Sequence, residues 1–217
     1  MKKIGILGTG IVGKTIGSKL IQLGYEVKMG SRTATNEKAI AWAKANGNKA
    51  LTGTFADVAT FDEIVFNCTK GEVTLEVFKQ AGIENFDGKT IIDISNPLDF
   101  SQGMPPILAP QYSNSNSLGE EVQKLLPNAY VVKTLNIVNC EVMVEATKSG
   151  GVPTMFVCGN NADAKEAVQG ILNQFGWTDI MDLGDISTAR GTEMMLPIWL
   201  RIYLSTQNGY FGFKVIR

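Results

Sequence analysis

Histidine does not occur among the 217 residues, and cysteine occurs three times, at Cys68, Cys140 and Cys158. The cysteines are odd in number, far apart and free of C-x-x-C spacing, so the sequence indicates neither a disulfide framework nor a zinc site. We expect buried free thiols and no bound metal.

Charge of one sign and long apolar runs are also scarce. The formal net charge is −1 and no basic run is longer than a pair, so nothing indicates binding to nucleic acid or to an anionic membrane. No apolar segment approaches the length that spans a bilayer, and Met1-Lys2-Lys3 leads directly into a predicted strand rather than into a signal peptide. We therefore expect a cytoplasmic protein.

Glycine is plentiful, and the start of the chain is organised around Gly8-Thr9-Gly10-Ile11-Val12-Gly13, which has G-x-G-x-x-G spacing. Gly8 can adopt the turn dihedrals, Gly10 allows backbone N–H groups to approach a pyrophosphate, and Gly13 allows close packing of a helix on a strand. An apolar strand precedes the motif, and an amphipathic helix and a second strand follow it. The sequence therefore predicts a β-α-β unit with a dinucleotide pyrophosphate at the helix start.

The second strand ends in Gly30-Ser31-Arg32-Thr33, and no acidic residue occurs from 27 to 36. In such a unit an acidic residue at this place binds the ribose 2′-OH of NAD, whereas a basic one accommodates the 2′-phosphate of NADP. The Arg32 guanidinium can bind a phosphate through two N–H groups, and the Ser31 and Thr33 hydroxyls add donors. The sequence favours NADP(H), and the alternative is that Arg32 is a solvated loop cation.

Two later strands end in polar residues. Residues 63–67 are followed by Cys68-Thr69-Lys70, and residues 90–94 by Ser95-Asn96-Pro97. Ligands of a doubly wound sheet bind beyond the carboxyl ends of its strands, so we expect both loops to border the cofactor, with Ser95 and Asn96 near the nicotinamide. The alternative for the second loop is an ordinary Asx or Ser turn before a proline.

The remaining pattern predicts the fold. Further strands are expected over 49–51, 130–133, 154–158 and 180–183, and helices over 36–47, 74–81, 118–126, 163–175 and 190–200. Ser117-Leu118-Gly119-Glu120 fits a capping box, and the proline-rich segment 100–117 is a candidate cover for a substrate. We predict an α/β Rossmann-type fold with a doubly wound, mostly parallel sheet, formed by a single domain over residues 1–217 with a C-terminal helical portion at about 185–217.

Several segments carry a family resemblance: the glycine motif, Gly30-Ser31-Arg32, residues 93–98, residues 125–136 and Leu196-Pro197-Ile198-Trp199-Leu200. Together they resemble bacterial members of the coenzyme F420-dependent NADP oxidoreductase family over nearly the whole chain. The resemblance implies a Rossmann domain with a small C-terminal helical portion, NADPH bound through Thr9, Ser31 and Arg32, and a homodimer. The cytosolic part of the six-transmembrane metalloreductases, which bind NADPH beside a flavin, is similar as well.

The resemblance also implies where the acceptor binds. Leu98, Asn136, Ile137 and Leu196 would line its pocket, and the acceptor would be FMN, FAD or a deazaflavin. Archaeal members that reduce deazaflavin place a histidine at the position of Asn136, and this sequence has none. A flavin or another small acceptor therefore stays open beside deazaflavin.

Hydride transfer to a stacked flavin-like ring needs alignment and exclusion of water more than a protein acid, so a chain without histidine can perform it. We expect an NADPH-dependent oxidoreductase, with no catalytic residue assigned. Reduction of a ketone or imine would call for a proton donor. Lys70 and Lys133 are candidates, although strand-end lysines are more typically solvated, and we interpret the Y-x-x-x-K spacing of Tyr210 and Lys214 as coincidence. A carbonyl or imine reductase and a non-catalytic NADP sensor remain alternatives.

Overall fold

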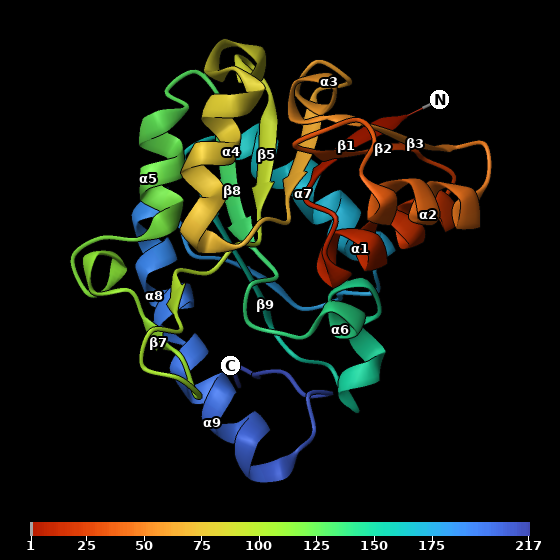
Figure 1. The fold of residues 1–217 in the computed structure, drawn as a ribbon. Coiled ribbons are helices and arrows are strands. Elements are labelled where there is room, and N and C mark those ends of the chain that lie inside the picture. Colours follow the sequence, from red (N-terminus) through yellow and green to blue (C-terminus); the bar gives the residue numbers. More distant parts are fainter. Residues whose placement is uncertain (1) are drawn as a thin grey trace.

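The computed structural model describes residues 2–217, which form one eight-stranded sheet with helices on both faces (Figure 1). The strands are β1 (Lys3–Leu7), β2 (Glu26–Ser31), β3 (Ala50–Thr54), β4 (Ile64–Asn67), β5 (Thr90–Asp93), β8 (Tyr130–Thr134), β9 (Met155–Gly159) and β10 (Ile180–Asp182). Their order is β10-β9-β8-β5-β4-β1-β2-β3, and neighbours are parallel except β8 and β9. The predicted α/β fold with a mostly parallel, doubly wound sheet is confirmed.

The order of the strands reverses beside β1. Leu7 at the end of β1 pairs with Gly30 of β2 on one side and with Asn67 of β4 on the other. The chain then continues outward in both directions from this point. In open α/β sheets, the carboxyl ends of two such strands border the crevice that binds ligands.

Helices cover both faces of the sheet. They are α1 (Ile11–Gln22), α2 (Glu37–Asn46), α3 (Phe55–Ala59), α4 (Thr74–Ala81), α5 (Leu118–Leu125), α6 (Cys140–Val144), α7 (Ala162–Gln174), α8 (Ala189–Met194) and α9 (Leu196–Thr206), with 3-10 turns at Gly71–Val73, Ile83–Phe86, Pro110–Tyr112, Ala146–Ser149 and Ile186–Thr188. One buried apolar cluster includes side chains of α1, α2, α6 and α7, and a second includes side chains of α3, α4, α5 and α8.

Local signals explain where several helices begin. Asn36 Oδ1 accepts the Ala39 N–H at 3.0 Å before α2, and Ser117 Oγ accepts the Glu120 N–H at 3.1 Å before α5. The capping box predicted at α5 is half formed, because the Glu120 carboxylate accepts the Ser117 hydroxyl and pairs with Arg190. These contacts lower the pKa of Glu120, mainly through Arg190. The cap therefore also ties α5 to α8.

The structure differs from the sequence prediction in three places. Helix α3 was not predicted, although Thr54 and Asp57 form a capping box at its start. The helix expected over 190–200 is two helices, and residues 207–217 are not helical; Thr154 holds them by donating its N–H to the Phe213 carbonyl at 2.8 Å. The loop expected over 100–117 contains β7 (Ile107–Leu108), which pairs with β6 (Leu98–Asp99). Within residues 2–217, no helix combines the length and the apolar character needed to cross a membrane.

Candidate functional site

The glycine motif forms a tight turn between β1 and α1. Gly8 has a φ of 112°, a left-handed value that favours glycine, and a Cβ there would lie 2.8 Å from the Cys68 carbonyl oxygen. A Cβ on Gly13 would lie 2.4 Å from the Gly8 carbonyl oxygen. Gly10 differs, because no atom other than those of Gly10 and its two chain neighbours lies within 4 Å of the place where its Cβ would be. Two glycines therefore close the turn, and the third leaves space above it.

The start of α1 faces this space without a cap. Gly10 is the N-cap residue, and no side chain hydrogen-bonds to the first N–H groups of the 12-residue helix. Thr9 is half-buried, and Ile11 is 72% exposed although it is apolar. An open helix start with free N–H groups fits the oxygens of a pyrophosphate, which the helix dipole also attracts. Thr9, Gly10, Ile11 and Val12 are the residues that would hold it.

The end of β2 lies beside the same turn, since the Gly8 N–H donates to the Gly30 carbonyl at 3.1 Å. Arg32 and Thr33 are exposed, and Arg32 makes no ion pair within residues 2–217. Ser31 is buried, and its hydroxyl donates to the Thr33 carbonyl at 2.6 Å. The side chains of Arg32 and Thr33 are thus free to bind a phosphate. The Ser31 hydroxyl proton is not available for this, because it is donated to the Thr33 carbonyl.

Polar side chains at the ends of β4 and β5 are bonded to one another. Asn67 Nδ2 donates to Asp93 Oδ1 at 2.8 Å, and Asn67 Oδ1 accepts the Thr69 hydroxyl at 2.6 Å. The Ser95 hydroxyl and N–H both donate to Asp93 Oδ1, at 2.7 and 3.1 Å. The second loop is therefore an Asx turn, as the alternative interpretation held, and its side chains also face a cavity described below.

Lys133, at the end of β8, is completely buried, so the expectation of a solvated lysine was wrong. Its Nζ lies 3.0 Å from Asp93 Oδ2, 2.8 Å from Glu193 Oε1 and 2.6 Å from the Ser95 carbonyl oxygen. Glu193 also accepts the first two N–H groups of α5, at 2.9 and 3.0 Å. Burial by itself lowers the pKa of Lys133, but the two carboxylates outweigh it and raise the pKa. Lys133 is a fixed cation inside the protein rather than a proton donor for a ligand.

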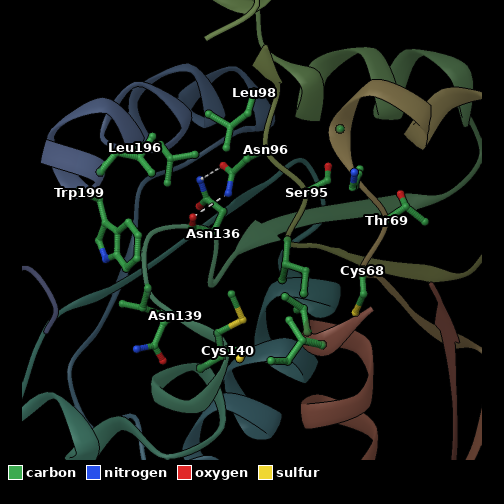
Figure 2. A pocket seen from close by; sticks show the side chains of 18 of the residues that line it. Cys68, Thr69, Ser95, Asn96, Leu98, Asn136, Asn139, Cys140, Leu196 and Trp199 are labelled. Carbon is green, nitrogen blue, oxygen red and sulfur yellow. Dashed lines mark hydrogen bonds between the residues drawn. The ribbon is translucent and has the colours of Figure 1, made fainter. Parts of the chain in front are cut away.

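Asn96 and Asn136 bridge the loops that follow β5 and β8. Asn96 Nδ2 donates to the Asn136 carbonyl oxygen at 2.8 Å, and Asn136 Nδ2 donates to Asn96 Oδ1 at 3.0 Å (Figure 2). Asn136 Nδ2 also donates to the Thr192 carbonyl oxygen at 3.1 Å. Because Thr192 belongs to α8, this bridge holds the C-terminal helices against the strand ends.

These loops, α6 and α9 enclose a cavity of about 450 Å³, which we call the slot. Its walls are mostly apolar. Figure 2 shows Leu196 and Trp199 of α9 across the slot from Ser95 and Thr69, with Cys140 at the start of α6 on a third side. The predicted site residues that line the slot are Ile11, Val12, Cys68, Thr69, Lys70, Ser95, Asn96, Leu98, Asn136 and Leu196.

Other predicted residues lie outside this lining. Gly8, Thr9, Gly10 and Gly13 belong to the turn and helix start around Ile11 and Val12, which do line the slot. Ser31, Arg32 and Thr33 lie at the end of β2, which is hydrogen-bonded to that turn. Pro97 lines a smaller pocket of about 280 Å³, which shares Gly71, Glu72 and Leu98 with the slot. Ile137 is buried in the apolar cluster that includes α1, whereas Asn136 before it lines the slot. The two residues lie in the turn after β8, where one side chain faces the slot and the next is buried in the core.

Phe100, in the segment proposed as a cover for a substrate, lines the slot. Several other lining residues were not assigned to the site from the sequence, among them Val138, Asn139, Met143, Trp199 and Leu200. The positions 196, 199 and 200 carry a usable signal, because residues three and four apart share one face of a helix. The Trp199 ring stacks with those of Tyr203 and Phe211, at centroid separations of 5.6 and 5.3 Å. Its Nε1 is the one side-chain nitrogen or oxygen of residues 2–217 that is inaccessible to solvent and has no hydrogen-bond partner.

Ionisable groups are few in the slot. Burial raises the pKa of Cys68, which keeps it a thiol, and Lys70 and Glu72 lie 3.8 Å apart with both side chains largely exposed. Tyr210 and Lys214 do not line it, and Lys214 Nζ instead pairs with Asp179 Oδ2 at 2.6 Å. No group of acidic or cysteine side chains within residues 2–217 is arranged to hold a metal ion.

Comparison with known proteins agrees with this architecture. The sequence profile of the family described as NADP oxidoreductase coenzyme F420-dependent matches residues 3–97. The F420-dependent NADP reductase of Methanocaldococcus jannaschii is 27% identical over 161 residues, which cover 73% of this chain and 70% of that protein. Metalloreductase STEAP3 of Rattus norvegicus is 25% identical over 209 residues, which cover 91% of this chain and 38% of that protein. The chain thus spans about two fifths of the length of this metalloreductase.

A solved structure covers the whole chain. It is that of a candidate F420-dependent NADP-reductase from Arthrobacter sp. FB24, which is 43% identical, with 100% of each chain covered and a TM-score of 0.94. This agreement in sequence and in fold extends over the glycine turn, the strand ends and the C-terminal helices alike. The chain therefore belongs to the F420-dependent NADP oxidoreductase family.

Proposed function

We propose that the protein is an NADPH-dependent oxidoreductase that transfers a hydride between NADP(H) and a flavin- or deazaflavin-type ring bound in the slot. The observation that carries the proposal is the slot itself. It is an apolar cavity of about 450 Å³, within the range of small-molecule sites, and it begins at Ile11 and Val12 on the open helix start. A flat ring there would lie next to the nicotinamide end of a dinucleotide.

The residues at and beside the slot favour one orientation of bound NADP(H). The pyrophosphate would lie against Thr9, Gly10, Ile11 and Val12, in the turn that Gly8 and Gly13 close. Arg32 would bind the 2′-phosphate, with the Thr33 hydroxyl beside it and Ser31 supporting their turn. The nicotinamide would reach the loops after β4 and β5, which contain Cys68, Thr69, Lys70, Ser95, Asn96 and Pro97.

The chain contributes alignment and a dry environment rather than an acid. Bound NADPH would supply the hydride, and the proton that completes the reduction of the acceptor ring would come from solvent. Leu98, Phe100 and Leu196 contribute apolar side chains to the lining, and they would shield a bound ring from water. Such a reaction needs no histidine.

A carbonyl or imine reductase is less well supported by the geometry. Lys133 is enclosed by Asp93 and Glu193, and Tyr210 and Lys214 lie outside the slot. Lys70 remains at the rim, with its side chain 80% exposed. Reduction of a carbonyl would ordinarily require a donor held near the reacting oxygen, and none of these lysines is held there.

The proposal is tested by anaerobic oxidation of NADPH in the presence of FMN, riboflavin or F420, with NADH as the comparison. We expect acceptor-dependent oxidation that is faster with NADPH. Leu196→Trp should block the slot and abolish turnover while NADPH still binds, and Leu204→Trp, on the same helix but outside the lining, should not. Tight NADPH binding with no reduction of any acceptor would instead identify a sensor, and oxidation that depends on aldehydes or imines but not on flavins would identify a carbonyl or imine reductase.

We also propose a cytoplasmic homodimer, as the family resemblance implies. The exposed apolar side chains of Ile198 and Tyr203 on α9 support a dimer, because a helix as apolar as α9 is seldom left uncovered. Sedimentation of the purified protein measures its mass in solution. A monomer at micromolar concentration would contradict the proposal.

A further inference from the structure

We infer that Asn136 Oδ1 receives a hydrogen bond from a ring N–H of the acceptor, and that it thereby selects acceptors with an imide edge. The inference rests on the proposed function, because it takes the slot to be the site of the acceptor. It assigns to Asn136 a role in specificity that the hydrogen bonds of the chain itself leave open.

The orientation of the Asn136 amide is fixed by its neighbours. Its Nδ2 group uses both hydrogens, one toward Asn96 Oδ1 at 3.0 Å and one toward the Thr192 carbonyl oxygen at 3.1 Å. A carbonyl has no proton to donate, so a rotation of the amide by half a turn would set two oxygens against each other. Nδ2 therefore faces α8 and the Asn96 loop, and Oδ1 faces away from them.

Asn136 Oδ1 accepts no hydrogen bond from residues 2–217, although the residue is only 3% exposed. Among residues 2–217, Trp199 Nε1 is the one solvent-inaccessible side-chain nitrogen or oxygen that has no hydrogen-bond partner. Asn136 Oδ1 has no partner either, so it must be accessible to solvent. Since Asn136 lines the slot, a donor can reach its oxygen from there. A ligand that fills the slot would shield this oxygen from water, so a ligand donor is needed there to avoid leaving it buried without a partner.

The acceptor atom is also held in place. Leu135, directly before it, is completely buried and has a φ of 61°, a value that a leucine keeps only where its surroundings impose it. On the other side of the bridge, Lys133 Nζ holds the Ser95 carbonyl at 2.6 Å and so fixes the turn that carries Asn96. A group fixed before binding discriminates between ligands without paying an ordering cost.

The chemistry of this atom indicates the ligand class. A neutral amide oxygen suits a neutral N–H donor, and it offers nothing to a ketone, an aldehyde or a quinone, which have only acceptor oxygens. Flavins and deazaflavins both carry an imide N–H at ring position 3, between two carbonyl groups. Asn136 would therefore orient either ring by the same edge.

Calorimetric binding in the presence of NADP⁺ tests this inference without turnover. Riboflavin should bind at least about tenfold more tightly than 3-methylriboflavin, because the methyl group removes the donor. In Asn136→Ala the two flavins should bind equally, and NADP⁺ affinity should be unchanged. Asn139→Ala is the matched control: Asn139 also lines the slot, but its Oδ1 already accepts the Glu141 and Val142 N–H groups at 3.0 Å, so the discrimination should persist.

Equal binding of both flavins to the unmodified protein would overturn the inference while leaving the proposed function intact. Absence of any flavin binding would overturn the proposed function and this inference together. If Asn136→Ala does not fold, Asn136→Ser, whose hydroxyl lies one bond short of the position of Oδ1, serves in its place. The 3-acetylpyridine analogue of NADP⁺ lacks the carboxamide N–H groups. If the unmodified protein binds this analogue more weakly than NADP⁺, and Asn136→Ala binds the two equally, Oδ1 accepts from the nicotinamide carboxamide and the inference is overturned.

Discussion

Two glycines of the N-terminal motif are expected to respond differently to the same added methyl group. Gly13→Ala places a Cβ 2.4 Å from the Gly8 carbonyl oxygen, so it should lower the free energy of unfolding by roughly 1–3 kcal/mol. That clash outweighs the gain of about 1 kcal/mol in helix propensity. Gly10 has a φ of −72° and open space around it, so Gly10→Ala should cost under about 1 kcal/mol.

Urea unfolding measures these stabilities. The effect of the two substitutions on NADPH binding is measured by calorimetry. Because the new methyl group of Gly10→Ala would occupy the space proposed for the pyrophosphate, the Kd for NADPH should rise by about tenfold or more. Gly13→Ala should affect binding only as far as it affects folding. Unchanged NADPH affinity in Gly10→Ala would contradict the proposed position of the pyrophosphate.

Arg32 is expected to decide between the two nicotinamide cofactors. Arg32→Asp removes a charged donor from the proposed 2′-phosphate site and adds a repelling charge, so the Kd for NADPH should rise by roughly tenfold to a hundredfold. NADH lacks that phosphate, and its Kd should change little. Lys44→Asp, near the end of α2, alters the net charge equally and is the control. Equal losses for both cofactors would show that Arg32 does not read the phosphate.

At the scale of single residues, the sequence predicts what depends on the backbone nearby. The positive φ of Gly8 and the asparagine cap at Asn36 follow from local chemistry, and both appear in the structure. The partner of Asn136 on α8 could not be predicted in this way. Thr192 lies 56 positions from Asn136, and no periodicity links the two.

Among the elements, β5, β8, α5 and α8 meet at one buried cation. Lys133→Met should lower the free energy of unfolding by about 3–5 kcal/mol, because it leaves the Asp93 and Glu193 carboxylates buried without their cation. Lys148→Met is the matched control, since Lys148 pairs with Glu141 at 3.0 Å where water screens both groups. Urea unfolding with a constant m-value distinguishes the two. A similar small effect for both variants would mean that the buried network contributes nothing specific.

The elements themselves were largely predictable from apolar spacing. The helix expected over 74–81 matches α4, and most strands lie within a residue or two of their predicted bounds. Helix α3 has five residues, too few for an apolar period to show, and it was missed. The surroundings of Lys133 were also missed, because burial of a strand-end lysine depends on Glu193, which reaches it from a helix distant in the sequence.

The molecule as a whole should lose the anchor of its last residues in acid. Asp179 binds Lys214, Thr154 and Arg217, and these contacts lower its pKa. A carboxylate with a lowered pKa stabilises the folded state above its unfolded pKa of about 3.9, and that contribution is lost as the pH falls through the folded value. The stability difference between the unmodified protein and Asp179→Asn should therefore be constant near neutral pH and shrink below about pH 4.

Unfolding curves measured from acid to neutral pH check this dependence. Added salt should reduce the same difference at neutral pH, because Lys214 and Arg217 are about half exposed. A difference that grows on acidification would show that Asp179 is not stabilised as a carboxylate.

We also propose that the chain unfolds as a single domain, because Glu193 caps α5 and thereby joins the C-terminal helices to the sheet. Two separate transitions would contradict this.

The contact between Glu193 and the start of α5 also has a consequence for synthesis on the ribosome. Glu193 follows Leu118 by 75 positions, so α5 and Lys133 emerge from the exit tunnel long before the carboxylate that completes their surroundings. Until α8 is translated, Lys133 has Asp93 as its one carboxylate partner, and the first two N–H groups of α5 lack the acceptor that Glu193 provides. We therefore expect the middle of the sheet to complete its packing only when nearly all of the chain has been made.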